Sequence, residues 1–97
     1  MASVPGFLAG KVSIITGASS GLGRAIALAF SKHGATVICA DRDASSPKSR
    51  SAGEESTDKL IASRGGKSLF VATDVTKAAS VQELVRAAAD TFGRVDV

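Results

Sequence analysis

The 97-residue sequence contains no tyrosine and no asparagine, and it has a single cysteine and a single histidine. Cys39 cannot form a disulfide within the chain, and its place inside an apolar run predicts a buried, unreactive thiol in a reducing, cytoplasmic setting. His33 stands next to Gly34, which suits a cation near the end of a helix better than a catalytic base. One cysteine and one histidine offer no zinc site, so we predict no metal.

Long apolar runs and a large excess of one charge are also missing. The first ten residues contain no charged side chain, and their longest apolar run is too short for a secretory signal or a membrane span. The 12 Lys and Arg residues outnumber the 9 Asp and Glu residues, but they are scattered rather than gathered on one helix. We therefore predict no membrane segment and no nucleic-acid partner, in a single small globular domain.

A glycine-rich corner stands between an apolar run and a helical repeat. The run over residues 12–16 is short, and most of its residues are β-branched and apolar, which predicts a strand buried on both faces. Apolar residues then recur at the spacing of one helix face, and Gly34 marks the end of the helix. The members of this predicted stripe are Leu22, Ala25, Ile26, Ala29 and Phe30. The corner thus precedes a helix N-terminus, where unpaired N–H groups and the helix dipole can hold a pyrophosphate.

Each glycine of the corner has its own physical reason. Gly17 allows a sharp turn, Gly21 allows the backbone to approach a phosphate, and Gly23 allows the helix to pack closely on the strand. The spacing is Thr-Gly-x-x-x-Gly-x-Gly, which differs from the Gly-x-Gly-x-x-Gly of other dinucleotide binders. It is not a P-loop, because Leu22 and Gly23 stand where Gly-Lys-[Ser/Thr] is required.

A second apolar run, residues 35–40, ends in Asp41, which lies 20 residues after Gly21. In dinucleotide-binding sites, an acid about 20 residues after the glycines accepts hydrogen bonds from the ribose hydroxyls. Asp41 could instead simply end a strand and begin a turn. Because the glycines and the acid occur together, in the order strand, turn, helix, strand and acid, we interpret the pattern as a dinucleotide site.

The rest of the chain continues the alternation of strands and helices. A polar, serine-rich stretch over 42–53 predicts a mobile loop, followed by helices over 54–64 and 78–92 and a strand over 67–73 between them. The predicted helix faces are Thr57, Leu60, Ile61 and Arg64, and then Val81, Leu84, Val85, Ala88 and Phe92, with Thr76 as a cap. The fold class is α/β, a three-layer Rossmann-type doubly wound parallel sheet in the order 3-2-1, with a vestigial fourth strand over 95–97 beside the first.

Residues 16–23, Asp41 and the pair Asp74 and Val75 resemble the amino-terminal half of the short-chain dehydrogenase/reductase family, and the match runs from about residue 8 to residue 97. The resemblance implies that the backbone from Ser19 to Leu22 holds the cofactor phosphates. It also implies that Asp41 selects the ribose and that Asp74 and Val75 meet the adenine. The candidate cofactor-binding residues are Gly17, Ser19, Ser20, Gly21, Leu22, Gly23, Asp41, Arg42, Asp74 and Val75.

The cofactor choice depends on Asp41, whose carboxylate favours a free 2′-hydroxyl and would repel a 2′-phosphate. Arg42, Lys48 and Arg50 argue the other way, since they could pair with that phosphate. In the resembling family a basic residue just before the middle glycine commonly marks NADP users, and this chain has Ser20 there. We therefore predict NAD, with NADP less favoured.

Hydride transfer in this family relies on a Tyr-x-x-x-Lys pair with a serine and an asparagine, all beyond the point that matches Val97. The resemblance thus implies an NAD(P)-dependent oxidoreductase of which residues 1–97 supply a partial Rossmann domain and no catalytic residue. A fragment that self-associates through its exposed sheet is one reading. A non-catalytic nucleotide-binding or partner-binding module is the alternative, and the glycine spacing argues against an adenosyl-methionine binder.

We expect the purified 97-residue chain to show no turnover of any alcohol or ketone with NAD or NADP. A positioned proton donor contributes a factor of about 10²–10⁴, and the chain has no tyrosine to supply it. A spectrophotometric assay of NADH formation checks this. Turnover that co-purifies with the chain and disappears in Gly21→Trp would contradict the prediction.

Overall fold

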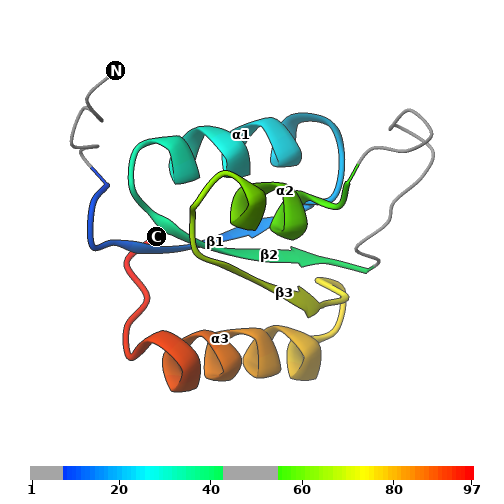
Figure 1. The fold of residues 1–97 in the computed structure, drawn as a ribbon. Helices are drawn as coiled ribbons and strands as arrows, with labels where there is room; N and C mark the ends of the chain where they lie inside the picture. The colour runs from blue at the N-terminus through cyan, green and yellow to red at the C-terminus, as the bar shows by residue number, and fades with distance from the viewer. Residues whose placement is uncertain (1–7, 43–54) are drawn as a thin grey trace.

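A computed structural model describes residues 8–42 and 55–97, in which a parallel sheet lies between two layers of helices (Figure 1). The elements are β1 (Val12–Thr16), α1 (Gly21–Lys32), β2 (Thr36–Asp41), α2 (Thr57–Ser63), β3 (Ser68–Ala72) and α3 (Ala78–Phe92). The loop predicted over 42–53 lies outside the described residues, except for Arg42. The predicted alternation of strands and helices is therefore confirmed.

The three strands run parallel in the order β1-β2-β3, which confirms the predicted order 3-2-1. β2 is the central strand, and its residues 37–40 are fully buried because helices cover both faces. This explains why the strand is an unbroken apolar run rather than an alternating one. Burial raises the pKa of the Cys39 thiol to about 12, which keeps the thiol protonated and unreactive, as predicted.

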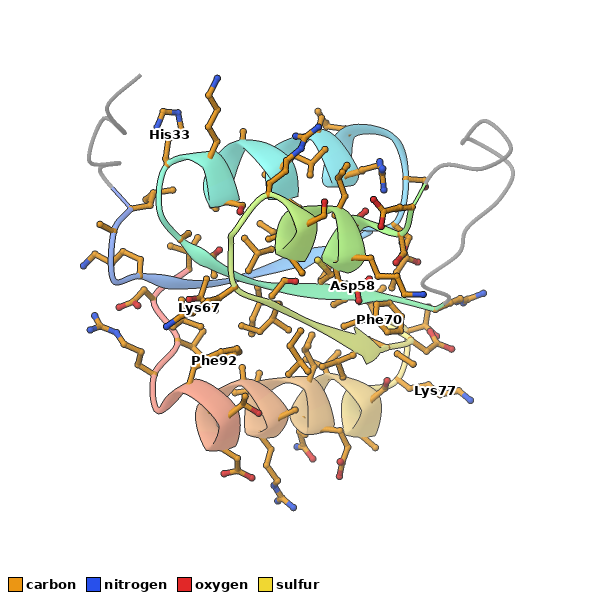
Figure 2. All side chains as sticks on the ribbon, in the orientation of Figure 1. His33, Asp58, Lys67, Phe70, Lys77 and Phe92 are labelled. Carbon is orange, nitrogen blue, oxygen red and sulfur yellow. The ribbon has the colours of Figure 1, made fainter. Side chains whose placement is uncertain are left out.

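The helices divide between the two faces of the sheet as right-handed crossovers require. α1 and α2 cover one face and α3 covers the other (Figure 1). Val37 and Cys39 of β2 pack in the core under α1 and α2, whereas Ile38 and Ala40 pack in the core over α3. Phe92 extends the second core at the end of α3, where it lies between the helix and the sheet (Figure 2). The three-layer arrangement is thus confirmed.

Residues 96 and 97 lie beside β1, on the edge away from β2. The Asp96 N–H donates to the Val12 carbonyl at 2.8 Å, and the Ile14 N–H donates to the Val97 carbonyl at 2.8 Å. The Asp96 carboxylate also accepts from the Val12 N–H at 2.8 Å and from two N–H groups of Arg94. Hydrogen bonds from Arg94 and Val12 lower the pKa of Asp96. The vestigial fourth strand therefore lies next to the first, as predicted, without regular strand geometry.

The buried side of α1 differs from the predicted stripe. Three members of that stripe are exposed instead: Leu22, Ala25 and Ala29. Ala27, which was not in the stripe, is fully buried, while Ile26 and Phe30 are half-buried. The helix is rotated so that Gly23 and Ala27, one turn apart, face the sheet. A small residue at each of these positions allows a closer approach than a stripe of larger residues would.

α2 is shorter than predicted, since it begins at Thr57 and residues 55 and 56 are not helical. It buries Thr57 and Ile61, whereas Arg64 is exposed and lies just past its last turn. Gly65, with a φ of 85°, follows the helix end, as predicted. β3 is likewise one residue shorter at each end than the predicted strand over 67–73.

α3 has the predicted length but a narrower buried face. Leu84 and Ala88 are buried, whereas Val81 and Val85 are 36% and 47% exposed because they lie on the flanks of the line along which the helix meets the sheet. The predicted cap is also wrong. Lys77 occupies the cap position, and the Thr76 side chain is turned toward Asp74, whose carboxylate accepts its hydroxyl proton.

We expect the isolated chain to self-associate, because Val81 and Val85 are exposed and residues 96 and 97 cover only part of the β1 edge. Sedimentation velocity should show a mass that rises with protein concentration. Val85→Lys should reduce this rise, and Ala79→Lys, at an exposed position elsewhere on α3, should not. A concentration-independent monomer with a sharp, cooperative melt would contradict the expectation.

Candidate functional site

The glycine corner joins the end of β1 to the start of α1. Gly17 and Gly21 have φ values of 67° and 56°, a left-handed conformation that favours glycine. Ser20 is the N-cap residue in an extended conformation, and its side chain makes no capping hydrogen bond. No described residue accepts a hydrogen bond from the N–H of Ser20, Gly21 or Leu22. The corner therefore presents several unpaired donors at the positive end of the α1 dipole.

Gly23 sits directly against the backbone of the corner. A Cβ atom at this position would overlap the carbonyl oxygen of Gly17 and would lie 2.6 Å from its carbonyl carbon and 3.1 Å from the Thr16 carbonyl oxygen. Any side chain would force the backbone apart. The close helix-to-strand packing predicted for Gly23 is therefore present in the structure.

Asp41 lies beside the corner because β1 and β2 run parallel with Thr16 opposite Ala40. Its Oδ2 accepts the Ser19 N–H at 3.0 Å, and its Oδ1 accepts the Arg42 N–H at 2.8 Å. A carboxylate has about four lone-pair positions, so both oxygens can accept further hydrogen bonds. The fold thus joins the glycines and the acid that the sequence analysis paired.

Asp74 follows β3 at the same edge of the sheet. Its Oδ1 accepts the N–H of Thr76 at 3.0 Å and the Thr76 hydroxyl at 2.6 Å, and it lies 3.4 Å from Nη2 of Arg42. These bonds, with those from Thr76 as the largest cause, lower the pKa of Asp74. Asp74 is therefore an ionised group, and its contact with Arg42 links the ends of the paired strands β2 and β3.

A hollow of about 320 Å³ opens at this edge of the sheet. It is lined by Arg42, Ala72, Thr73, Asp74, Lys77 and Ser80. Val75 follows Asp74 in the chain and is 62% exposed. Ser80 is a residue that the sequence analysis missed, and its hydroxyl accepts the Asp74 N–H at 2.8 Å. Lys77, which is exposed, also lines the hollow and lies on this side of the molecule (Figure 2).

A larger hollow, of about 830 Å³, lies at the opposite edge of the sheet, between the ends of α1 and α2. Lys32, Arg64 and Lys67 line it, and Figure 2 shows Lys67 and His33 on this side, away from Lys77. Helices end here, so their carbonyl groups and the negative ends of their dipoles face the hollow. This backbone polarity disfavours a phosphate and complements the basic side chains already there, so the smaller hollow, at the carboxyl ends of the strands, is the better candidate.

Thr57 is a second residue near the corner that the sequence analysis did not assign to the site. Its side chain is buried, and its hydroxyl donates to the Ala18 carbonyl at 2.6 Å while accepting from Nη1 of Arg24 at 3.0 Å. The sequence analysis placed Thr57 on the face of a helix. A hydroxyl beside Leu60 and Ile61 on that face was the signal that pointed to a buried polar contact.

In residues 8–42 and 55–97, no three His, Cys, Asp or Glu side chains are grouped so that they could hold a metal ion. Within the same ranges, no helix has the length and apolar character needed to cross a membrane.

Gly23→Ala should destabilise the fold more than Gly21→Ala. The added methyl group at Gly23 meets fixed backbone atoms, so we expect a loss of about 3 kcal/mol, within the range for overpacking. At Gly21 nothing lies within 4 Å, and only the left-handed conformation costs about 1–2 kcal/mol. Urea unfolding of both variants measures the difference. Equal losses of stability, or a larger loss at Gly21, would show that the close approach of Gly23 to the Gly17 carbonyl does not limit which residue can stand at position 23.

Comparison with known proteins places these features in one family. The family model for short chain dehydrogenase matches residues 11–97. The short chain dehydrogenase/reductase astE of Aspergillus oryzae is 41% identical over 90 residues, covering 93% of this chain and 32% of the relative. The chain therefore spans about a third of the length of this curated relative.

Two solved structures of the same family are also similar. A short chain dehydrogenase/reductase from Burkholderia phymatum, determined in complex with NAD, is 36% identical with a TM-score of 0.77, over 91% of this chain and 29% of that one. The 3-ketoacyl-(acyl-carrier-protein) reductase of Brucella melitensis, complexed with NADH, is 40% identical with a TM-score of 0.71, over 92% and 32% respectively. The glycine corner, the acid beside it and the order of the parallel strands thus have one common explanation, which is that this chain belongs to the short-chain dehydrogenase/reductase family.

Proposed function

We propose that this chain binds the adenosine and pyrophosphate parts of a nicotinamide dinucleotide, as the cofactor-binding half of an oxidoreductase. One observation carries the proposal: the unpaired N–H groups of Ser20, Gly21 and Leu22 stand at a helix N-terminus beside the Asp41 carboxylate. Backbone donors and a positive dipole suit a pyrophosphate, and a neighbouring carboxylate suits ribose hydroxyls. Together they match the two chemical parts of one ligand.

The geometry of the corner fits such a ligand. The space where a Cβ of Gly21 would stand is open to at least 4 Å, so a phosphate can come close to the backbone. Leu22 is 77% exposed beside the donors, which leaves its apolar side chain free to cover the bound pyrophosphate from solvent. In this assignment Gly17 and Gly23 shape the corner and Ser19 joins it to Asp41.

The second part of the site would receive the adenine. Asp74 and Val75 follow β3 beside the hollow of about 320 Å³, and Arg42 also lines it. The Asp74 side chain is already engaged by Thr76 and Arg42, so its role is to fix the wall of the hollow. Exposed Val75 offers an apolar surface on which a purine can lie.

The related proteins support the dinucleotide assignment, since those from Burkholderia phymatum and Brucella melitensis were solved with NAD and NADH. When bound, the nicotinamide ring donates or accepts the hydride of the reaction. Gly17 to Gly23 and Asp41 would bind and orient the other end of the cofactor. Because the chain spans about a third of these relatives, the redox activity of the whole protein is itself part of the proposal.

NAD is the cofactor that the site favours over NADP. The Asp41 carboxylate would face the 2′ position of the ribose, where a phosphate would meet a like charge. Arg42 is the residue that could compensate for that charge, but its Nη2 lies 3.4 Å from Asp74. The Asp74 charge offsets part of the Arg42 charge, so less of it is available to neutralise a 2′-phosphate.

Titration with ADP-ribose and with its 2′-phosphorylated form tests the choice. We expect ADP-ribose to bind at least about tenfold more tightly, since like charges at contact distance cost on the order of 1–4 kcal/mol when partly screened. Asp41→Asn should remove most of the preference, because the amide oxygen can still accept the Ser19 N–H while the charge is lost.

Arg42→Gln is the matched control, and it should leave the preference for ADP-ribose unchanged or increase it. Tighter binding of the phosphorylated ligand to the unmutated chain would overturn the proposal for NAD. An unchanged preference in Asp41→Asn, with a reduced affinity for the phosphorylated form in Arg42→Gln, would make Arg42 the selecting residue.

A further inference from the structure

The peptide group between Ala18 and Ser19 is held at both of its ends by side chains from other elements. The Ala18 carbonyl accepts the hydroxyl of Thr57 at 2.6 Å, and the Ser19 N–H donates to Asp41 Oδ2 at 3.0 Å. The carbonyl and the N–H belong to one rigid plane, so two bonds at opposite ends fix how that plane is turned. Thr57 lies at the start of α2 and Asp41 at the end of β2.

The Thr57 hydroxyl is directed toward the corner by a third group. A hydroxyl has one proton to donate, and Nη1 of Arg24 donates to Thr57 Oγ1 at 3.0 Å. The hydroxyl proton is thereby left for the Ala18 carbonyl. Ala18, Ser19 and Thr57 are each at most 2% exposed, and the bond from Thr57 to the Ala18 carbonyl is buried, so water does not compete for it.

We infer that Thr57 is a positioning residue for the phosphate corner, acting with Asp41 to clamp the Ala18–Ser19 peptide group. The inference rests on the proposed function of the corner. Gly17 and Gly21 lie on either side of this peptide group, and glycine by itself resists rotation least of all residues. The clamp supplies the stiffness that the glycines lack, so that the N–H groups after Ser19 already point toward the phosphate site before the ligand binds.

The clamp also gives Asp41 a second task besides facing the ribose. One of its oxygens holds the corner in place, and the lone pairs that remain are available to the ligand. Through Thr57, the start of α2 supports the proposed site, although none of the residues assigned to bind the ligand belongs to α2. Preorganisation of this kind raises affinity, because the corner loses less conformational entropy when the ligand binds.

Thr57→Val tests the clamp, since valine keeps the shape of the side chain and removes the hydroxyl. We expect the variant to bind ADP-ribose about tenfold more weakly, the factor that corresponds to one net hydrogen bond. Thr57→Ser, which keeps the hydroxyl, should bind within about twofold of the unmutated chain. Ser13→Ala is the matched control, because the Ser13 hydroxyl is equally buried and contacts the Thr36 carbonyl at 3.4 Å, away from the corner.

The pattern among the three variants decides the outcome. Weaker binding in Thr57→Val alone supports the clamp. Unchanged binding in a folded Thr57→Val overturns it, and so does an equal loss of affinity in Ser13→Ala, which would indicate general destabilisation.

Hydrogen exchange of the Ser19 amide in the ligand-free chain separates the clamp from the proposed function. It should be about tenfold faster in Thr57→Val than in the unmutated chain and Thr57→Ser. If the unmutated chain does not bind ADP-ribose but this pattern holds, the clamp stands and the proposed ligand fails. An unchanged exchange rate overturns the clamp whatever the ligand.

A measurement on the unmutated chain covers the case in which Thr57→Val does not fold. The Thr57 hydroxyl proton, buried and held by the Ala18 carbonyl, should exchange slowly enough to give its own NMR signal. A hydroxyl proton that exchanges as fast as those of exposed threonines would overturn the inference.

Discussion

The contact between Gly23 and the carbonyl group of Gly17 is the constraint on which the rest of this structure depends. It seats the first turn of α1 directly on the end of β1, closer than any residue with a side chain would allow. The same contact rotates the helix so that Ala27 faces the sheet, and it leaves the N–H groups of the first turn pointing past the end of the strand. A single missing Cβ therefore determines both the packing of α1 and the donors of the proposed site.

Parallel strands explain how residues far apart in the sequence meet at this corner. All three strands end at one edge of the sheet, so Thr16, Asp41 and the segment after Ala72 become neighbours. The helices begin at that edge and end at the other, which gives the two edges opposite polarity (Figure 1). Polarity, more than the volume of a hollow, distinguishes a phosphate site here, because the larger hollow lies among helix ends that carry carbonyl groups.

The sequence was enough to predict the strands, the layers and the pairing of the corner with Asp41, because these depend on local spacing and on the handedness of crossovers. It was not enough to predict the rotation of α1, since Leu22 and Ala27 fit a helical period equally well and only the contact at Gly23 decides between them. Thr57 escaped prediction because its partner, the Ala18 carbonyl, is 39 residues away. Thr76 was misassigned as a cap because its side chain turns back to donate to the Asp74 carboxylate, and the helix begins one residue later than that cap would require.

Mapping of backbone amide shifts during titration with ADP-ribose tests most directly whether the corner is the binding site. If it is, the largest changes should occur at Ser20, Gly21 and Leu22, with smaller changes at Asp41 and Asp74. The residues of the larger hollow, such as Lys32, Gly65 and Lys67, should not change. Shifts confined to that hollow, or no shifts at millimolar ligand, would contradict the account.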